Sequence, residues 1–302
     1  MTSTLITGGL GYLGRNVVAR LASAGEPVVS YNRDFAASEQ AGVTCVQGEL
    51  YDLPRLVETL QRYDVGRIVH TAAMSHPELS VELPITTVTA NVDGTVHVFE
   101  AARMAGVKRI VNFSSECAYG HVEGPVREDA ALRPTTPYGV TKVATELLGR
   151  VYTDLYGLDV VSLRPTELYG PGNKMPQYLR EMIRAALDGE PYRLESGADQ
   201  GFHFVHVDDV ARATELAASV TSPRRRVYNI TGGAQVRLAD ASAIVRDAVP
   251  GADIEIGPGL LELDQQGPYD ISAAAAELGY EPHWSLETGL NSYIDHLREN
   301  RY

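Results

Sequence analysis

A tyrosine and a lysine stand four residues apart in the segment Tyr138-Gly-Val-Thr-Lys142. On a helix this spacing places both side chains on one face. A phenol hydroxyl has an ordinary pKa of about 10 and is a poor base at neutral pH, but a nearby ammonium favours its phenolate form. The pair could therefore exchange a proton with a substrate oxygen. Many helices carry such a pair by chance, so its meaning depends on other residues of the chain.

Two serines, Ser114 and Ser115, follow the apolar run 109–113. We expect this run to be a buried strand, and ligands of α/β folds bind at the carboxyl ends of such strands. A serine there can hold the reacting oxygen of a substrate. The two serines and the Tyr138/Lys142 pair together indicate a site for hydride and proton transfer at one carbon–oxygen bond.

A glycine-rich turn lies at the N-terminus. Gly8, Gly11 and Gly14 recur every three residues, after an expected strand at 4–7 and at the start of an expected helix at 11–24. Glycines allow a tight turn and a close approach of backbone N–H groups to a pyrophosphate, which the helix N-terminus then stabilises. The predicted dinucleotide contacts of this turn are Gly8, Gly11, Tyr12, Leu13 and Gly14.

The residues after the second expected strand bear on the type of cofactor. A carboxylate at that position binds the ribose hydroxyls of NAD. Here the position is Asn32, followed by Arg33. The missing acid and the added cation slightly favour NADP over NAD, although a register change of two residues would place Asp34 there and restore NAD.

Short apolar runs alternate with amphipathic stretches through the first half of the chain. This pattern is typical of a parallel sheet covered on both faces, and it predicts an α/β, Rossmann-type doubly wound fold. We expect a dinucleotide-binding domain at 1–166 and a smaller C-terminal α/β substrate lobe at 167–302, with the segment about 203–233 a candidate to return to the main sheet. The expected strands are 4–7, 28–31, 43–47, 67–70, 109–113, 160–163 and 227–230, and the expected helices are 11–24, 53–63, 88–105, 138–156, 176–187, 206–219 and 238–249.

Composition excludes several classes of partner. The formal charge of −13 argues against nucleic acid and anionic membranes, and no apolar run is long enough to span a bilayer. The two cysteines, Cys45 and Cys117, have no metal-ligand spacing. The chain enters an apolar strand almost at once, without a charged leader, so we expect a cytoplasmic protein without a metal.

The chain also resembles a known family, the extended short-chain dehydrogenases/reductases, a class that includes the NAD-dependent epimerase/dehydratases. The resemblance covers nearly the whole sequence. It is carried, beyond the glycine turn and the Tyr138/Lys142 pair, by Thr71-Ala72-Ala73, Asn91-Val92-Asp93-Gly94-Thr95, Ser114-Ser115-Glu116-Cys117-Ala118-Tyr119-Gly120, Leu168-Tyr169-Gly170-Pro171-Gly172, Phe204-Val205-His206-Val207-Asp208-Asp209-Val210, Asp270-Ile271-Ser272, Leu278-Gly279-Tyr280-Glu281-Pro282 and Leu286-Glu287-Thr288-Gly289-Leu290.

The resemblance implies roles for individual residues. It gives Ser115 as the catalytic serine and Tyr138 as the general acid/base. Lys142 lowers the pKa of the tyrosine and binds the cofactor. The expected cofactor contacts are Glu49 and Leu50 at the adenine, Ala72 and Ala73 along the cofactor, and Pro165 and Leu168 at the nicotinamide end. Asn91 is expected to brace either the central strands or the cofactor site. Members of the class often pair through the helices that match 88–105 and 138–156, which implies a homodimer.

Three departures from the pattern concern the substrate. Nucleotide-sugar members usually carry an arginine where this chain has Phe202, and a second arginine in the segment that is 264–269 here, which has no cation. An asparagine near the diphosphate is replaced by Glu167. Guanidinium groups bind phosphate in a bidentate manner, and a carboxylate repels it. Phe202, Glu167, Ser115 and Glu116 are the predicted substrate residues.

The sequence therefore predicts an NAD(P)-dependent oxidoreductase or epimerase that acts on a secondary hydroxyl or carbonyl of a sugar, sugar acid or similar small hydroxylated substrate. One alternative is a nucleotide-sugar epimerase with an atypical diphosphate site. Another, of a different class, is a non-enzymatic cofactor-sensing regulator, which usually lacks the Tyr/Lys pair. Dehydratases of the class tend to have two acids after the catalytic serine or threonine; here Glu116 is an acid and Cys117 is not.

Overall fold

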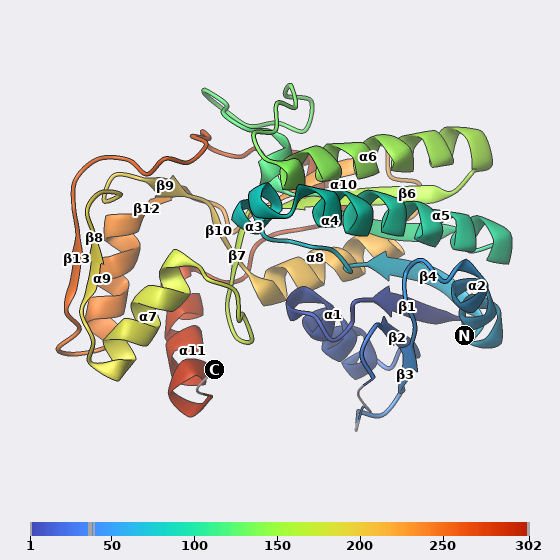
Figure 1. The fold of residues 1–302 in the computed structure, drawn as a ribbon, viewed down its shortest axis with the longest axis horizontal. Helices are drawn as coiled ribbons and strands as arrows, with labels where there is room; N and C mark the ends of the chain where they lie inside the picture. Colours follow the sequence, from blue (N-terminus) through green and yellow to red (C-terminus); the bar gives the residue numbers. More distant parts are fainter. Residues whose placement is uncertain (1, 36–37, 39, 301–302) are drawn as a thin grey trace.

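A seven-stranded parallel sheet forms the centre of the larger part of the molecule (Figure 1). The computed structural model describes residues 2–35, 38 and 40–300. The strand order is β11-β6-β5-β4-β1-β2-β3, so the direction of winding reverses between β1 and β4, where ligands bind in such sheets. The strands are β1 (Ser3–Thr7), β2 (Val28–Asn32), β3 (Val43–Gln47), β4 (Val65–His70), β5 (Arg109–Phe113), β6 (Asp159–Pro165) and β11 (Val227–Ile230).

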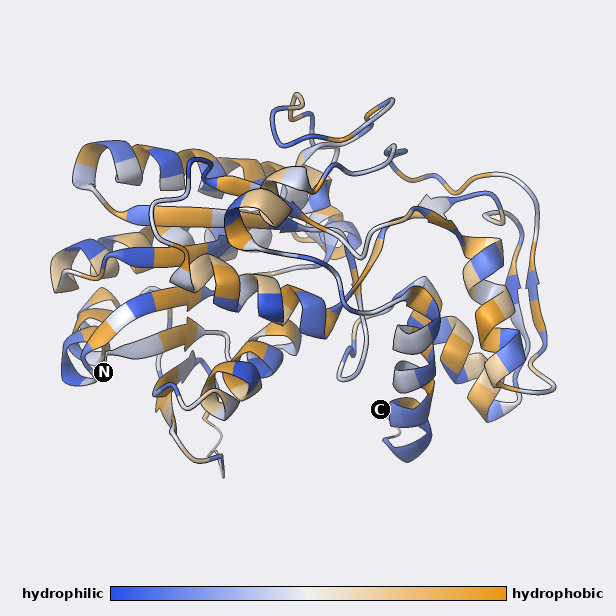
Figure 2. Cartoon of the chain, turned by 180° about the vertical axis from the view of Figure 1, so that it is seen from behind, coloured by the Kyte–Doolittle hydropathy of each residue, from blue (hydrophilic) through white to orange (hydrophobic). Residues whose placement is uncertain are grey.

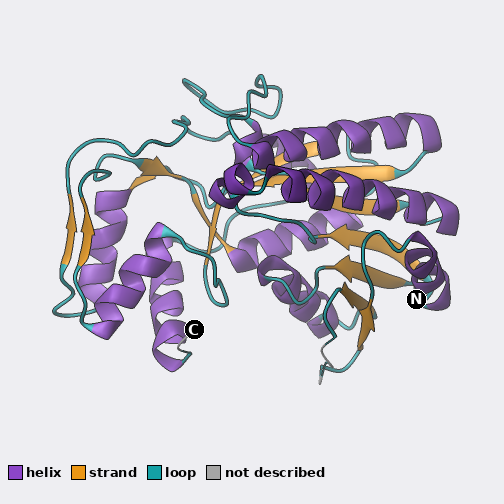
Figure 3. Cartoon of the chain, viewed as in Figure 1, coloured by secondary structure: helices purple, strands orange, loops and turns teal. Residues whose placement is uncertain are grey.

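Helices cover both faces of this sheet (Figure 3). On one face, Val17 and Leu21 pack in the same core as Val210 and Leu278. On the other, Leu56, Phe99 and Tyr152 share a second core. The first face is covered by α1 (Tyr12–Ser23), α8 (Val207–Ser219) and α10 (Ser272–Leu278), and the second by α2 (Leu53–Arg62), α5 (Gly94–Ala105) and α6 (Pro137–Tyr156).

The predicted α/β, Rossmann-type doubly wound sheet is confirmed. The inner strands β1 and β2 are buried along their whole length, because helices cover the sheet from both sides. Figure 2 shows hydrophobic residues along several strands of the sheet. The sequence did not predict two short helices before α5, α3 (Pro77–Glu82) and α4 (Pro84–Val88). The expected helix at 88–105 includes Thr89–Asp93, which instead forms a π-helical turn before α5. Each short helix begins at a proline and is too brief to show a helical period.

A second, smaller lobe lies beside the sheet, on the left of Figure 1. Its core is formed by residues such as Leu179, Met182, Leu238, Val245 and Leu290. Its elements are α7 (Tyr178–Asp188), β8 (Tyr192–Leu194), β9 (Gly201–Phe202), β12 (Val236–Arg237), α9 (Leu238–Ala248), β13 (Ile254–Ile256) and α11 (Leu286–Glu299).

The chain passes between the two parts several times. The parallel pair β7 (Glu167–Tyr169) and β10 (Phe204–His206) lies at the junction. After β10 the chain returns as α8 and β11, and β11 pairs with β6 in the main sheet. It then re-enters the lobe, comes back as α10 and ends in the lobe as α11. The lobe is therefore inserted between elements of the sheet domain rather than appended to it.

A buried ion pair joins α6 to β6. Two nitrogens of the Arg164 guanidinium donate to the two carboxylate oxygens of Glu146 at 2.7 and 2.6 Å. The third nitrogen donates to the Tyr119 hydroxyl and to the Glu128 carbonyl oxygen. Because Arg164 and Glu146 are both buried, each charge depends on the other for its compensation.

Removing one charge of this pair should destabilise the fold. We expect Glu146→Gln to lower the free energy of unfolding by about 3–5 kcal/mol, because the Arg164 guanidinium stays buried without its counter-charge. The double change Glu146→Leu with Arg164→Met should recover most of the loss. Urea titration followed by circular dichroism measures both. As a control, Glu58→Gln in the exposed pair with Arg55 should cost less than about 1 kcal/mol; equal losses at the two sites would contradict the prediction.

Candidate functional site

Tyr138 stands in the first turn of α6, and three residues fix its position. Pro137 occupies the first helical position, and the Thr136 side chain caps the helix by accepting from the backbone N–H of Gly139. The hydroxyl of Ser80, from α3, accepts from the backbone N–H of Tyr138 at 3.0 Å. The tyrosine is thus held on a rigid element near the carboxyl end of β5.

Lys142 lies one turn further along the same helix face. Its ammonium donates to the carbonyl oxygen of Phe113, the last residue of β5, at 2.8 Å, and lies 5.3 Å from the centre of the Tyr138 ring. Burial lowers the pKa of Lys142 to about 8. The group therefore remains mainly protonated at neutral pH, and its charge lies beside the phenol.

Ser115 completes the group. Its hydroxyl accepts from the backbone N–H of Cys117 at 3.1 Å. Burial raises the pKa of Tyr138, and a hydrogen bond with Ser115 acts in the opposite direction. Before any ligand binds, Tyr138 is therefore a neutral phenol that can donate a proton to a substrate oxygen. The structure brings Ser115, Tyr138 and Lys142 together as the sequence predicts.

Asn91 fastens the turn after β4 to α6. Its side chain accepts from the backbone N–H of Met74 at 2.7 Å and donates to the Met74 carbonyl oxygen and to the Thr141 hydroxyl. Asn91 lies in the π-helical turn before α5, an irregularity that is frequent at functional sites. Through Thr141 it braces the residue that precedes Lys142 on α6.

A buried hydrogen-bond chain connects this brace to the first strand. The Thr95 hydroxyl donates to the Asn91 carbonyl oxygen, and the His70 ring joins the hydroxyls of Thr95 and Thr7 at 3.0 and 2.7 Å. Burial lowers the pKa of His70 to about 3, so the ring stays neutral. The relative positions of β1, β4, α5 and α6 are fixed by these polar contacts.

The glycine turn fits a dinucleotide. Gly8 has a φ of +70°, and a Cβ there would lie 2.9 Å from the backbone of Ala72. A Cβ on Gly14 would lie 2.1 Å from the carbonyl oxygen of Gly8. The N-cap of α1, Gly11, provides no side-chain cap. The helix N-terminus is therefore suited to an anionic ligand, and the close packing leaves room for no side chain but hydrogen at Gly8 and Gly14.

The side chains next to these glycines have structural tasks. The Tyr12 hydroxyl donates to the Gly170 carbonyl oxygen at 3.2 Å, and Leu13 packs against the core under α1. These two residues can contact a pyrophosphate through the backbone N–H groups of the first helical turn. The hydrogen bond of Tyr12 to Gly170 and the packing of Leu13 could not be predicted from the glycine spacing alone.

Asn32 and Arg33 differ in their surroundings. The Asn32 side chain accepts from the backbone N–H of Leu10 at 2.8 Å and donates to the Ser30 hydroxyl, so it ties β2 to the glycine turn. The Arg33 side chain is 74% exposed, and its guanidinium lies 3.9 Å from the Asp34 carboxylate. The positive charge of Arg33 is thus accompanied by the negative charge of Asp34.

The other expected cofactor residues follow the strands of the sheet. Glu49 accepts at its carbonyl oxygen from the Tyr31 hydroxyl at 3.0 Å, and Leu50 packs against the core beside α5. Ala72 and Ala73 come directly after β4, where Ala72 abuts Gly8. Pro165 ends β6, and Leu168 lies in β7. All these positions lie at or just beyond the carboxyl ends of parallel strands, where the fold binds ligands.

Glu116 and Glu167 face the same region. Burial raises the pKa of Glu116 well above its ordinary value, and the negative charge of Glu167 raises it further. Burial also raises the pKa of Glu167, while a hydrogen bond from Gln177 and the charge of His76 lower it.

Phe202 instead packs in the core of the second lobe, stacked on Phe204 with 5.2 Å between the ring centres.

Some residues that organise the site were not predicted from the sequence. Ser80, Thr141 and Gln177 hold Tyr138, Asn91 and Glu167, respectively. Each is an ordinary polar residue on a helix or loop, and its partner is far away in the sequence. No local pattern could have identified them.

Two absences apply to the described residues, 2–35, 38 and 40–300. None of the helices there is long and apolar enough to cross a membrane. Within the same ranges, no three or more His, Cys, Asp or Glu side chains gather in a way that could hold a metal ion.

Comparison with known proteins gives consistent matches over the whole chain. The model of the NAD dependent epimerase/dehydratase family matches residues 4–231. A dTDP-glucose 4,6-dehydratase of Streptomyces antibioticus is 30% identical, over 98% of this chain and 92% of the relative. A UDP-glucuronate 4-epimerase of Thermodesulfobacterium geofontis is 26% identical, over 98% of this chain and 96% of the relative.

Solved structures agree with these relatives. MoeE5 in complex with UDP-glucuronic acid and NAD is 31% identical, with a TM-score of 0.89, over 98% of this chain and 99% of MoeE5. The UDP-glucose 4-epimerase of Thermus thermophilus in complex with NAD is 25% identical, with a TM-score of 0.88, over 98% of this chain and 99% of the other. Similarity along the full length of each protein includes the second lobe as well as the sheet.

Proposed function

Because the chain belongs to the NAD-dependent epimerase/dehydratase family of enzymes, we propose that Ser115, Tyr138 and Lys142 catalyse hydride transfer at a secondary hydroxyl or carbonyl of a sugar-like substrate. The observation that carries the proposal is the buried ammonium of Lys142 beside the Tyr138 ring, with Ser115 close enough to favour the phenolate form of that tyrosine.

The three side chains have separate tasks in this reaction. A bound nicotinamide supplies or accepts the hydride at the substrate carbon. Ser115 holds the substrate oxygen within reach of the phenol, and Tyr138 gives that oxygen a proton in reduction or removes one in oxidation. Lys142 stabilises the phenolate that remains, because the attraction between its ammonium and the phenolate is strong in a buried, poorly solvated environment. Gly8, Gly11, Gly14 and the first turn of α1 hold the pyrophosphate, with Glu49, Leu50, Ala72, Ala73, Pro165 and Leu168 along the rest of the cofactor.

The step after oxidation decides the product. An epimerase would return the hydride to the other face of the carbonyl, whereas a dehydrogenase would release the carbonyl product and the reduced cofactor. Elimination of water would need a second acid–base group beside Glu116, and burial raises the pKa of the neighbouring Cys117 thiol to about 12. That thiol is neutral at physiological pH, so we favour a dehydrogenase, reductase or epimerase over a dehydratase.

The proton transfer can be tested at Tyr138. We expect Tyr138→Phe to lower kcat by about 10²–10⁴-fold, because the substrate oxygen loses its general acid/base. The affinity of the Tyr138→Phe variant for the cofactor, measured by calorimetry, should stay near that of the wild type.

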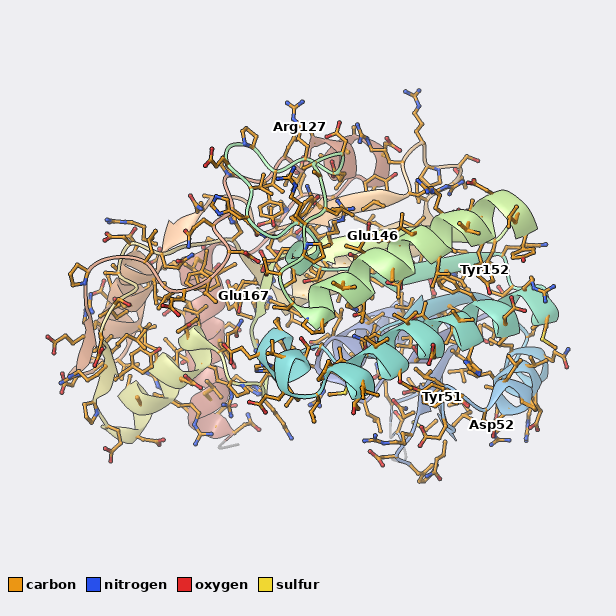
Figure 4. All side chains as sticks on the ribbon, turned by 45° about the horizontal axis from the view of Figure 1, so that its top comes forward. Tyr51, Asp52, Arg127, Glu146, Tyr152 and Glu167 are labelled. Carbon is orange, nitrogen blue, oxygen red and sulfur yellow. The ribbon has the colours of Figure 1, made fainter. Side chains whose placement is uncertain are left out.

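The matched control is Tyr152→Phe on the same helix, labelled in Figure 4, whose hydroxyl bonds Glu100 far from Lys142. It should retain near wild-type kcat. Full activity in the Tyr138 variant would show that another group moves the proton.

We further propose NAD rather than NADP as the cofactor. The slight preference for NADP that Arg33 implied finds no support among the relatives, and MoeE5 was solved with NAD. The Asp34 carboxylate, 3.9 Å from the Arg33 guanidinium, opposes the binding of a 2′-phosphate.

Calorimetry with the two cofactors tests this preference. NAD should bind at least about tenfold more tightly than NADP, a difference of about 1.4 kcal/mol. Asp34→Asn should reduce the ratio of the NADP and NAD dissociation constants, because it removes the charge that opposes the 2′-phosphate. Asp154→Asn, an exposed change on α6, should leave this ratio unchanged. Tighter binding of NADP by the wild type would refute the assignment.

We also propose a homodimer formed through α4, α5 and α6. Their outer surface exposes Ile85 (82% exposed), Met104, Leu147 and Leu155. On α6 the exposed apolar residues Val140, Leu147, Val151 and Leu155 recur at helical spacing and make one stripe. A contiguous apolar surface of this kind is typical of a protein interface.

Light scattering after gel filtration measures the oligomeric state. The wild type should have the mass of a dimer, and the double change Ile85→Glu with Leu147→Glu should give a folded monomer, because two charges would be buried in the interface. Leu260→Glu, at an equally exposed leucine of the second lobe, should remain dimeric. A monomeric wild type at micromolar concentration would contradict the proposal.

A further inference from the structure

Two carboxylates lie close to the reacting hydroxyl. Glu116 begins the short helical turn Glu116–Ala118 directly after Ser115, and Glu167 begins β7. Each raises the pKa of Tyr138 through its negative charge, after the larger effect of burial. Figure 4 labels Glu167 between the N-terminal end of α6 and the second lobe. The two acids therefore border the space in which a substrate must present its carbon–oxygen bond to Tyr138.

Glu167 is held in a fixed orientation. The Gln177 side-chain amide donates to its carboxylate at 2.5 Å and to the Leu168 carbonyl oxygen at 2.9 Å. Gln177 is itself oriented, because its oxygen accepts from the Asn173 side chain at 2.9 Å. One face of the carboxylate is thus used for support, and an acidic side chain here is a built feature of the site rather than a mobile surface group.

His203 adds a buried nitrogen without a partner. The side chain is only 3% exposed, and among the described residues its Nε2 has no hydrogen-bond partner. Its carbonyl oxygen accepts from the backbone N–H of Glu167, and its ring packs edge-on against Tyr269 at 4.9 Å. Burial lowers the pKa of His203 to about 4, so the imidazole is neutral. Buried polar atoms are rarely left unpaired in a finished structure, so this nitrogen points to a ligand.

The segment between β13 and α10 closes this region without contributing a cation. The Gln266 side chain donates to the carbonyl oxygens of Glu116 and Gly120 and accepts from the Tyr269 hydroxyl. The Gln265 side chain donates to Gln200 at 2.9 Å. In Figure 1 this segment runs from the second lobe back to the sheet domain. Both amides are used inside the protein, so neither is available to hold a diphosphate.

We propose that Glu116, Glu167 and His203 bind the hydroxyl groups of a neutral, unphosphorylated sugar or polyol, and that Glu167 excludes substrates that carry a nucleoside diphosphate. This inference rests on the proposed function, since it assigns the substrate class of the same site. Glu167 is the specificity-determining residue. The unpaired Nε2 of His203 forms a hydrogen bond with a substrate hydroxyl.

The chemistry of the three groups fits hydroxyls. A carboxylate accepts strong, charge-assisted hydrogen bonds from hydroxyl groups, and a neutral imidazole nitrogen can accept or donate one. Burial, and after it the charge of Glu167, raises the pKa of Glu116 well above its ordinary value, so a protonated Glu116 can also donate a hydrogen bond. A diphosphate would bring two negative charges beside them, and like charges in a poorly solvated site repel strongly.

Binding of UDP is the first test, with enzyme saturated with NAD. We expect Glu167→Gln, which keeps the size and the contact with Gln177, to bind UDP at least about tenfold more tightly than the wild type, because a repulsive charge is removed. Glu181→Gln, which removes an exposed carboxylate of α7, should match the wild type. Equal or weaker binding by Glu167→Gln would overturn the role of Glu167. Calorimetry of UDP requires no knowledge of the natural sugar, so this comparison decides the matter by itself.

Turnover is the second test. A panel of free sugars and polyols is compared with the corresponding UDP-sugars, with products followed by NMR and by cofactor reduction. The wild type should turn over a free sugar with the higher kcat/KM, and Glu167→Gln should lower that value by about 10–100-fold, as expected for a lost charge-assisted hydrogen bond. Preference for a UDP-sugar in a reaction abolished by Tyr138→Phe would overturn this inference and leave the proposed function intact. Turnover that survives Tyr138→Phe would overturn the proposed function instead.

Discussion

The contact between the Lys142 ammonium and the Phe113 carbonyl oxygen determines how α6 meets the sheet. A charge buried at this depth is costly, and its ordinary solvation is replaced by one carbonyl dipole and the face of the Tyr138 ring. The lowered pKa of Lys142, about 8, reflects that cost. The contact is possible only if β5 ends at Phe113 and α6 begins just before Tyr138, and the caps at Thr136 and Pro137 fix that start.

The polar chain through Thr7, His70, Thr95 and Asn91 explains how two distant motifs act as one site. The glycine turn follows β1, whereas the Tyr/Lys pair lies on α6, more than a hundred residues later. A neutral histidine is suited to the middle of this chain, because a protonated ring would add a second buried cation near Lys142. The glycine turn and the Tyr138/Lys142 pair are therefore fixed relative to each other by contacts within the protein.

The sequence predicted the parts of the molecule whose signals are local. Apolar runs marked the strands of the sheet, and the spacing of Gly8, Gly11 and Gly14 marked the turn before α1. The short helices at 77–88 escaped prediction because two prolines divide a segment too brief to show a period. For Asn32, sequence position suggested contact with the cofactor, but its amide is used to bind Leu10 and Ser30. Phe202 was predicted at the substrate, and its aromatic ring packs in the apolar core of the lobe.

The insertion of the second lobe into the sheet domain has a consequence for synthesis on the ribosome. The edge strand β11 begins at Val227, whereas its partner β6 ends at Pro165. At about 5–20 residues per second, β6 waits about 3–12 seconds before β11 emerges to cover it. During that time an apolar strand edge is open to pairing with other chains. The nascent domain therefore passes through an aggregation-prone stage whose length is determined by the number of residues in the segment 166–226, which carries the first part of the lobe and α8. Slower translation of that segment would prolong the stage.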